Sequence, residues 1–519
     1  MRTVSVLLSL CAVGGLAAGA SLDEVKIDTG RVKGAISGPV VTFKGIPYAA
    51  APVGANRWRP PQPAVHWPGL RPATEFGADC MQLPFPSDAA PLGTKPAEDC
   101  LFVNVWRPAA RSPRLPVMVW IYGGGFVNGG SSPAVYDGSR FAGRGQVFVS
   151  FNYRVGRFGF FAHPALTKET PAGPLGNYAF MDQIAALQWV KKNIAAFGGD
   201  PGNVTIFGES AGGHSVLTLM TSPAARGLFQ KAIVESGGGR NLMGPMRQLS
   251  QSSGQLASAE SIGLAFAKKA GIEGEDRAAL DALRKLPPEN VVDHLNMASM
   301  NSPTYCGPML DGKIVVESVE HALLAGRQAK VAFMAGANSA DIGFSFAKTM
   351  DQVFAPFGDN RAQAQAVYNP DSSTIVSAIG RLVAMDRMMI EPARFAVRQM
   401  AAAGERAYEF RFSYVAESMR SQWKGAPHAS EIPFVFATVA ARYGDKLAPA
   451  DQALSDAANA YWSAFAKTGD PNGEGRPAWP AYVPTADALL DFTEHGPVAR
   501  PDPWKARLDL TEAASLKSK

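Results

Sequence analysis

Apolar and polar positions alternate along the chain in blocks that predict strands and helices in turn. Apolar runs rich in β-branched and aromatic residues, typical of buried strands, occupy residues 116–122, 203–207 and 331–336. Residues 215–220 follow the second run with a pattern that can continue as a helix. Strands and helices alternate between about 117 and 234, which favours a mostly parallel sheet. The predicted fold class is α/β.

The run Phe-Gly-Glu-Ser-Ala-Gly-Gly at residues 207–213 places Ser210 between a predicted strand and a predicted helix. A serine at such a turn exposes its hydroxyl, and its neighbours Gly208 and Gly212 must be nearly free of side chain so that strand and helix can approach. The alternative is a plain Gly/Ser-rich turn, because a chain with 52 glycines can match so short a pattern by chance. A nucleophilic Ser210 is a hypothesis that needs partners.

A serine hydroxyl is a poor nucleophile without a general base. In α/β-hydrolase folds an acid and then a histidine follow the nucleophile along the chain, which excludes His66 and His163. His214 comes too soon after the serine to leave room for the acid, and we interpret it as a packing or surface histidine. The remaining candidates are His294, His321, His428 and His495. His428 is favoured, because it lies in a turn-rich segment before the apolar residues 432–436.

Asp341 is the predicted acid. It ends the loop 337–341, which follows the apolar run 331–336, so a carboxylate there would lie beside the other loops at the strand ends. Taken singly, such an aspartate is more often a solvated loop carboxylate, and such a histidine is more often a surface or structural residue. Only their combination with Ser210 favours a catalytic triad.

The apolar run 116–122 ends in Gly123-Gly124-Gly125-Phe126. A glycine run after a strand can turn its N–H groups toward one point, and the N–H of Ala211, directly after the serine, can join them in binding a tetrahedral oxyanion. A phosphate-binding loop does not fit, because the lysine and Ser/Thr of a P-loop are missing, as is the spacing of a dinucleotide-binding motif.

With further motifs along the chain, these residues resemble the type-B carboxylesterases, the family that includes the cholinesterases. The resemblance covers nearly all of the chain after its N-terminus. Its motifs, besides residues 207–213, are Phe43-Lys44-Gly45-Ile46-Pro47-Tyr48-Ala49, Glu98-Asp99-Cys100-Leu101-Phe102-Val103-Asn104-Val105, Asn152-Tyr153-Arg154-Val155-Gly156 and Phe197-Gly198-Gly199-Asp200-Pro201. It implies an α/β-hydrolase fold with helical insertions and hydrolysis of carboxylic esters.

The resemblance also implies roles for single residues. The family's triad positions are occupied by Ser210, Asp341 and His428. Its oxyanion-hole positions are occupied by Gly124, Gly125 and Ala211, and its buried polar network near the triad by Glu209 and Ser236. Two ion pairs of the family fold are matched by Arg57 with Glu98 and by Arg154 with Asp182, although a solvated charge explains any one of these four residues equally well.

The chain departs from the family at two places near the site. The family's acid is usually glutamate followed directly by glycine, whereas Asp341 is one methylene shorter, so its loop must approach the histidine more closely. The loop between Cys80 and Cys100 holds Phe85 but lacks the tryptophan that binds quaternary ammonium in cholinesterases, which argues against choline esters.

Two further expectations follow from the resemblance. Thr304 and Cys306 fall where bulky aromatics close the acyl pocket of cholinesterases, so we expect a pocket that accepts larger acyl groups. A disulfide between Cys80 and Cys100 is expected in an oxidising compartment, where it would stabilise the protein by about 3 kcal/mol. Cys306 is then left unpaired, half-buried and inert.

Composition limits the possible partners. The net charge of +5 is spread along the chain and gives no basic stripe for nucleic acid. No apolar segment after the N-terminus reaches the roughly 18 residues needed to span a bilayer. The N-terminus carries Arg2, an apolar run over residues 4–16 and Ala18-Gly19-Ala20, which together predict a cleaved secretory signal over residues 1–20. We expect a secreted or periplasmic protein.

The chain after the signal, residues 21–519, is large enough for one extensive α/β core with insertions, or for two domains. We expect one catalytic domain with cap insertions near 248–315 and 350–425. No cluster of Cys, His and carboxylates has metal-ligand spacing, so neither metal nor cofactor is expected. The oligomeric state is left open.

The predicted function is hydrolysis of a small-molecule carboxylic ester through an acyl-enzyme. One alternative is a non-catalytic, cholinesterase-like adhesion module, which typically has lost the serine or the histidine; both are present here. Another is a hydrolase of amide, carbamate or lactone bonds, which the triad alone does not separate from an esterase.

Overall fold

The computed structural model describes residues 21–86, 89–110, 112–241 and 246–517, so the predicted signal lies outside the described residues. One eleven-stranded sheet has the spatial order β16 (Gly496–Pro501), β15 (Ala488–Thr493), β14 (Ala407–Phe412), β13 (Ala332–Asn338), β12 (Lys231–Glu235), β11 (Gly199–Glu209), β7 (Leu115–Ile121), β8 (Val147–Phe151), β6 (Phe102–Pro108), β4 (Val40–Pro47) and β3 (Ala35–Ser37). Neighbours from β8 to β15 pair in parallel. Antiparallel strands complete both edges. The mostly parallel sheet is confirmed.

The sequence explains why the middle of this sheet is parallel. Strands β7 and β11 carry near-continuous apolar runs, and Val119, Trp120 and Ile206 are fully buried. Such runs are typical of strands that are covered on both faces. The five remaining strands are β1 (Glu24–Ile27), β2 (Gly30–Lys33) and β5 (Leu70–Pro72) in one small sheet, and β9 (Phe160–Phe161) with β10 (Gly176–Asn177) in another.

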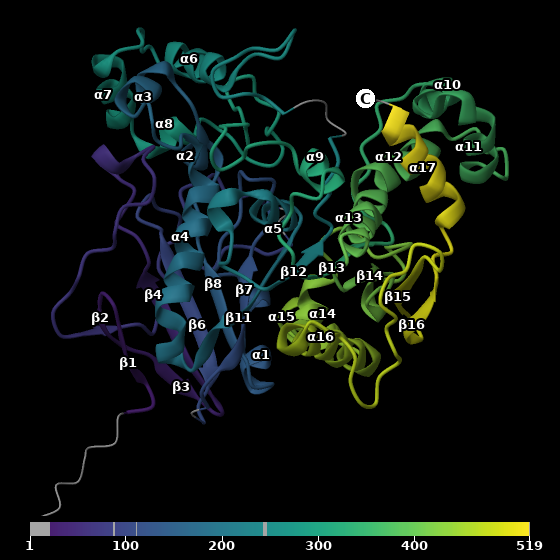
Figure 1. Ribbon diagram of the computed structural model, residues 1–519, viewed down its shortest axis with the longest axis horizontal. Helices are drawn as coiled ribbons and strands as arrows, with labels where there is room; N and C mark the ends of the chain where they lie inside the picture. The colour runs from purple at the N-terminus through teal and green to yellow at the C-terminus, as the bar shows by residue number, and fades with distance from the viewer. Residues whose placement is uncertain (1–20, 87–88, 111, 242–245, 518–519) are drawn as a thin grey trace, which may run out of the picture.

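Helices flank the sheet (Figure 1). The helices of the described residues are α1 (Ser139–Gly143), α2 (Gly156–Gly159), α3 (Pro164–Glu169), α4 (Tyr178–Asn193), α5 (Ala211–Thr221), α6 (Ala259–Lys269), α7 (Arg277–Lys285), α8 (Pro288–Val292), α9 (Val319–Leu324), α10 (Met350–Phe354), α11 (Arg361–Tyr368), α12 (Val376–Met385), α13 (Glu391–Ala402), α14 (Ile432–Val435), α15 (Val439–Tyr443), α16 (Pro449–Thr468) and α17 (Lys505–Lys517). Helix α5 packs on β11 and β12, α13 packs on β13 and β14, and α16 contacts β11 and β7. These helices bury both faces of the central strands.

The first predicted insertion, residues 248–315, holds α6, α7 and α8, which group with α3 at the upper left of Figure 1. Two of these helices begin at a side-chain cap: Ser258 accepts a hydrogen bond from the N–H of Ser261 at the start of α6, and Asp276 accepts one from the N–H of Ala279 at the start of α7. Arg284 of α7 pairs with Glu169 at the end of α3 through two hydrogen bonds of 2.8 and 2.7 Å. This ion pair holds the insertion against the rest of the protein.

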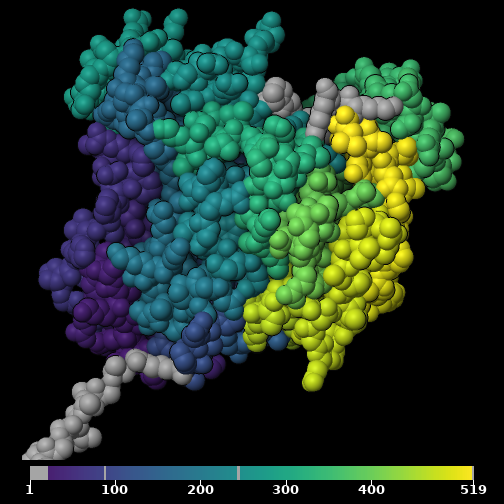
Figure 2. All heavy atoms as spheres, viewed as in Figure 1, coloured from purple at the N-terminus to yellow at the C-terminus, as the bar shows by residue number. Residues whose placement is uncertain are grey.

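The second predicted insertion, residues 350–425, is not an insertion throughout. Helices α10, α11 and α12 lie away from the sheet, at the upper right of Figures 1 and 2. Within the same range, however, α13 packs on the sheet and β14 is one of its strands. All six residues of β14 are buried, and the strand pairs with β13 on one side and with β15 on the other. The part outside the sheet therefore ends before α13.

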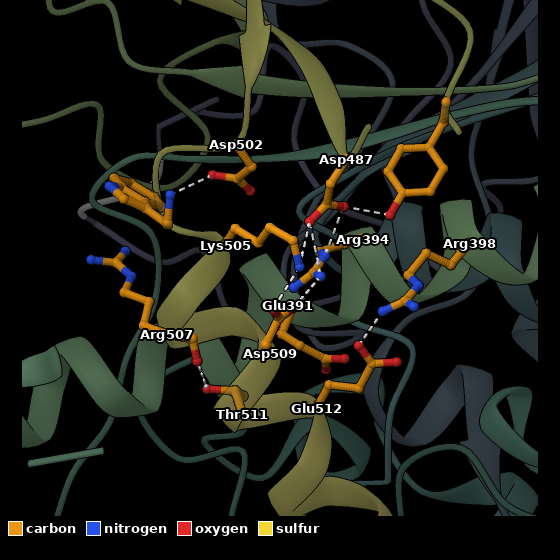
Figure 3. Close-up of polar contacts among 12 residues, drawn as sticks. Glu391, Arg394, Arg398, Asp487, Asp502, Lys505, Arg507, Asp509, Thr511 and Glu512 are labelled. Atoms are coloured by element: carbon orange, nitrogen blue, oxygen red, sulfur yellow. Dashed lines mark hydrogen bonds and ion pairs between the residues drawn. The ribbon is translucent and has the colours of Figure 1, made fainter. Parts of the chain in front are cut away.

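The C-terminal helix α17 closes the fold beside these helices. Figure 3 shows Arg394 of α13 between Asp487 and Asp509, and Arg398 of the same helix paired with Glu512. Asp509 and Glu512 both belong to α17. Two arginines on successive turns of α13 therefore hold α17 in place.

Candidate active site

Ser210 occupies a sharp turn between β11 and α5. Its backbone has φ 57° and ψ −123°, a conformation that L-residues rarely adopt, and its N–H donates to the carbonyl of Glu235. A Cβ atom added at Gly212 would lie 2.0 Å from the carbonyl oxygen of Ile121, and one at Gly208 would lie 2.6 Å from the backbone of Gly212. Both glycines are therefore required where strand and helix approach.

Asp341 and His428 meet at the carboxyl end of the sheet. Asp341 follows β13, and its Oδ1 lies 2.6 Å from Nδ1 of His428. The other carboxylate oxygen accepts hydrogen bonds from the Ser236 hydroxyl at 2.6 Å and from the Asn338 N–H at 2.9 Å. The backbone N–H of Ile342 donates to Oδ1 at 2.7 Å. These donors and the histidine lower the pKa of Asp341 against the raising effect of its burial.

The short aspartate reaches the histidine because two loops pair with each other. A single parallel β-bridge joins Ala340 to Pro427, and the N–H of Ala340 donates to the carbonyl of Ala426 at 2.9 Å. These contacts draw the loop after β13 toward the segment that carries His428. With the loops held in this way, the aspartate lies 2.6 Å from the histidine ring.

The second ring nitrogen of His428 faces a carboxylate. Its Nε2 lies 3.1 Å from Oε1 of Glu209, and within the described residues no hydrogen bond joins it to the hydroxyl of Ser210. Burial disfavours the charged ring, but Glu209 and Asp341 together outweigh burial and raise the pKa of His428 to about 10. In this arrangement the imidazole is stabilised as a cation.

Two further buried carboxyl groups near Asp341 and His428 were missed in the sequence. Burial raises the pKa of Glu431 to about 7, and its carboxylate accepts from the side-chain amide of Asn338. Burial also raises the pKa of Glu235, whose Oε1 accepts from the indole N–H of Trp462 at 2.8 Å. A signal was available for Glu235, because it ends an apolar strand directly before Ser236.

The glycine loop after β7 lies against the serine. A Cβ atom added at Gly123 would come within 3.1 Å of the Ser210 Cβ atom. Gly124 and Gly125 have φ values of 104° and 63°, which glycine adopts readily. Within the described residues their N–H groups donate no backbone hydrogen bond, whereas the carbonyl of Gly124 accepts from Asn128. The loop therefore leaves donors available beside the serine.

A cavity of about 430 Å³ opens over Ser210, His428 and the glycine loop. Its walls are mainly apolar and include four methionines, Met297 and Met300 from the first insertion and Met388 and Met389 from the segment between α12 and α13. The loop closed by the disulfide contributes two alanines to the wall, Ala89 and Ala90. The remaining side chains include Tyr136, Ile342, Phe344 and Ile432.

The predicted acyl-pocket residues do not line this cavity. Thr304 instead accepts a hydrogen bond from Arg157 at 2.7 Å. The Cys306 thiol points to the carbonyl of Phe160, and burial raises its pKa to about 12. We correct this prediction: Met297 and Met300, earlier on the same segment, provide the wall.

The other predicted contacts are found. Cys80 and Cys100 form a disulfide. Buried ion pairs join Arg57 to Glu98 at 2.6 Å and Arg154 to Asp182 at 2.7 Å. His214 packs edge-on against Phe126, and burial lowers its pKa. Across the described residues we find neither a cluster of His, Cys, Asp and Glu suited to a metal ion nor a helix able to span a membrane.

Comparisons with known proteins agree with this architecture. The model of the carboxylesterase family matches residues 21–377 and 359–507. Fumonisin B1 esterase from Sphingopyxis macrogoltabida is 36% identical over 89% of this chain and 86% of its own length. Para-nitrobenzyl esterase from Bacillus subtilis (strain 168) is 36% identical over 87% and 91%. A solved PNB esterase superposes with a TM-score of 0.80 and 31% identity, covering 95% of this chain and 99% of the other.

A serine elbow at the end of a mostly parallel sheet, with the acid and the histidine on the following loops, defines an α/β-hydrolase. The chain belongs to the carboxylesterase family and is a carboxylic ester hydrolase that acts as a serine hydrolase. The adhesion-module alternative is not favoured, because the relatives found are esterases.

Proposed function

We propose that Ser210 is the nucleophile of this ester hydrolase, His428 its general base and Asp341 the residue that orients the base. The observation that carries the proposal is the 2.6 Å contact of Asp341 with Nδ1 of His428, beside a serine held at positive φ. With Nδ1–H donated to Asp341, the neutral ring has its lone pair on Nε2, where it can take the serine proton.

The reaction then proceeds in two halves. The Ser210 oxygen attacks the ester carbonyl, and the N–H groups of Gly124, Gly125 and Ala211 stabilise the oxyanion. The protonated His428 gives its proton to the leaving alcohol, which produces an acyl-enzyme. A water that is deprotonated by the same ring releases the carboxylic acid and restores the serine.

The proposal is tested by hydrolysis of p-nitrophenyl butyrate. Ser210→Ala is expected to lower kcat by at least about a thousandfold, since the covalent route is lost. Ser222→Ala removes a buried hydroxyl, without a hydrogen-bond partner among the described residues, from the residue just after α5, and it should keep activity near that of the wild type. Comparable loss in both variants would contradict the assignment of Ser210.

We further propose that the preferred esters carry bulky apolar groups next to the carbonyl. Support comes from the four methionines of the cavity, whose flexible, polarisable side chains adapt to irregular apolar shapes. Acyl-chain profiling with p-nitrophenyl esters from acetate to dodecanoate should show kcat/KM rising beyond acetate. A sharp preference for acetate would refute this substrate class.

Export of the enzyme is also a proposal. It is supported by the signal pattern of residues 1–20 and by a disulfide, which persists in oxidising compartments. N-terminal sequencing of the enzyme from the periplasm and the medium should give a chain that begins near Ser21. An intact Met1 in all fractions would argue against a cleaved signal.

A further inference from the structure

A second cavity, of about 420 Å³, adjoins the one over the serine. It is formed by the loop after Asp341 and by α10, α12 and the segment that follows α12. Phe344 lines both cavities, so they share a wall. Phe344 and Phe346 are 65% and 86% exposed, which gives this second cavity an apolar rim open to solvent. No carboxylate is among the described residues that line it.

The cationic side chain of this cavity is Arg387. It belongs to η6 (Asp386–Ile390), one turn of π-helix between α12 and α13, and π-helical turns are frequent at functional sites. The Nε atom of Arg387 is buried and has no hydrogen-bond partner among the described residues. The residue as a whole is half-buried, and a partly desolvated guanidinium gains from an anion, because the ion pair offsets the desolvation.

The nearest carboxylate in sequence does not serve as its partner. Asp386 is buried and engaged elsewhere: its carboxylate accepts from the hydroxyl of Tyr368 at 2.8 Å and pairs with Nε of Arg507 at 2.7 Å. Burial lowers the pKa of Arg387, while Tyr368 is the group that raises it. Among the described residues no carboxylate pairs with Arg387, which lines the second cavity.

Arginines that are buried more deeply are paired with carboxylates. Arg240 pairs with two glutamates, and Arg394 pairs with Asp487 and Asp509. Such pairs are how proteins compensate a buried guanidinium. By the same chemistry, the anion that fits Arg387 is a carboxylate that arrives with a ligand.

The π-helical turn η6 places Arg387 directly before residues that line the cavity over Ser210. Met388 and Met389, the two residues after Arg387, line the cavity over Ser210. Phe344 is a residue that the linings of both cavities share, so an acyl chain that extends past its ring would reach the second cavity. A substrate with an ester at one end and a free carboxylate at the other can thus occupy both cavities.

We propose that the second cavity binds a free carboxylate carried by the ester substrate, with Arg387 as its counter-ion. The enzyme then favours esters whose acyl chain ends in a carboxylate over esters of equal length that end in methyl. This inference rests on the proposed function of Ser210 and adds to it the chemistry of the distal end of the substrate.

The test compares p-nitrophenyl esters of monocarboxylic acids with mono-p-nitrophenyl esters of dicarboxylic acids, from about six to about twelve carbons. The readout is the ratio of the two kcat/KM values at each length within one preparation, so that any loss of folded enzyme cancels. In the wild type this ratio should exceed one above a minimum length. Arg387→Gln should lower it by about tenfold, and Arg387→Lys by less, because the charge remains.

Arg381→Gln is the matched control, because Arg381 is an exposed arginine of α12 and should leave the ratio as in the wild type. A ratio below one at every length, or an equal ratio in wild type and Arg387→Gln, would overturn the inference. Octanoate added as a free acid tests whether the second cavity instead binds a carboxylate that is not part of the substrate. Arg387-dependent inhibition by octanoate, without any preference for carboxylate-ended esters, would also overturn the inference. If the wild type does not hydrolyse methyl-ended esters at all, that result contradicts the proposed function of Ser210 and not the inference about Arg387.

Discussion

At the scale of single residues, His428 lies between two carboxylates. Asp341 holds Nδ1 at 2.6 Å, and Glu209 lies 3.1 Å from Nε2. Both favour the imidazolium, so the pKa of His428 rises to about 10 despite burial. This contact stabilises the fold fully below the unfolded value near 6.5, and the contribution is lost as pH rises through about 10. The neutral imidazole of His428 is therefore well populated only as the pH approaches about 10.

This arrangement predicts the effect of Glu209→Gln on the pH profile. Removal of one negative neighbour lowers the pKa of His428, so the neutral base is present at lower pH. The acid limb of kcat/KM for p-nitrophenyl butyrate should shift toward lower pH by about one unit, whatever the change in its plateau. Glu275→Gln, which alters an exposed carboxylate paired with Lys168, should leave the limb in place. If the acid limb of the Glu209→Gln profile keeps its pH position, or moves to higher pH, this role of Glu209 is contradicted.

At the scale of elements, the elbow between β11 and α5 depends on space that only glycine leaves. The backbone of α5 passes so close to β7 that an added Cβ atom at Gly212 would lie 2.0 Å from the Ile121 carbonyl oxygen. Backbone atoms cannot move aside as a flexible side chain can. The close packing of α5 against β7 therefore also fixes the position of Ser210.

Gly212→Ala should destabilise the protein and lower its activity together. We expect a loss of at least about 2 kcal/mol in unfolding free energy, as for an overpacked core, measured by urea denaturation. The control Gly143→Ala lies at the end of α1, where an added Cβ atom meets nothing within 4 Å, and should change stability by less than about 1 kcal/mol. A fully stable and active Gly212→Ala enzyme would contradict the close approach.

The π-helical turn η6 and the C-terminal helix α17 are joined by the buried pair of Asp386 and Arg507. Burial raises the pKa of Asp386 to about 6, although Arg507 opposes the rise. Its carboxylate is therefore charged at neutral pH and depends on the arginine. The ion pair thus connects the segment that lines both cavities to the last helix of the chain.

Arg507→Met should lower the unfolding free energy by about 3 kcal/mol at pH 8, because it leaves Asp386 buried without its counter-charge. The loss should shrink below pH 6, where the carboxyl group becomes protonated and no longer needs a cation. Arg361→Met removes an exposed pair with Asp351 and should change stability by less than about 1 kcal/mol. Equal effects of the two variants at both pH values would refute this account of η6.

At the scale of the whole molecule, the walls of the catalytic cavity come from distant parts of the chain. The disulfide loop, the glycine loop and segments from both predicted insertions all contribute residues to these walls. The Cys80–Cys100 disulfide ties down the loop that supplies Ala89 and Ala90. Because the cross-link restricts the unfolded chain, its contribution belongs to the whole protein rather than to a local contact.

Replacement of both cysteines, Cys80→Ser with Cys100→Ser, should lower the unfolding free energy by about 3 kcal/mol. Urea denaturation with and without dithiothreitol provides the measurement: reductant should destabilise the wild type and leave the double variant unchanged. Cys306→Ala keeps the disulfide and should still respond to reductant like the wild type. A wild type that is indifferent to reductant would show that the cross-link contributes little.

Much of the fold could be predicted because its signals are local. The apolar runs of β7, β11 and β13 and the glycines around Ser210 each follow from the chemistry of a few neighbouring residues. The extent of the second insertion was wrong at its end, because the pattern alone did not separate α13 and β14 from the helices before them. The acyl-pocket residues were misplaced because Thr304 turns to Arg157.

The sequence by itself indicated the class of chemistry, ester hydrolysis by a serine hydrolase, and supplied the candidates for it: a serine in a glycine frame, and an acid and a histidine in the required order after it. Short-range steric constraints require those residue types, so they can be recognised in the local sequence pattern. Only the tertiary structure decided what surrounds that chemistry, namely the contact of Glu209 with His428, the methionines over the serine, and Arg387 in the next cavity, whose Nε has no hydrogen-bond partner among the described residues. These contacts join segments far apart along the chain, and a local pattern does not record which segments meet.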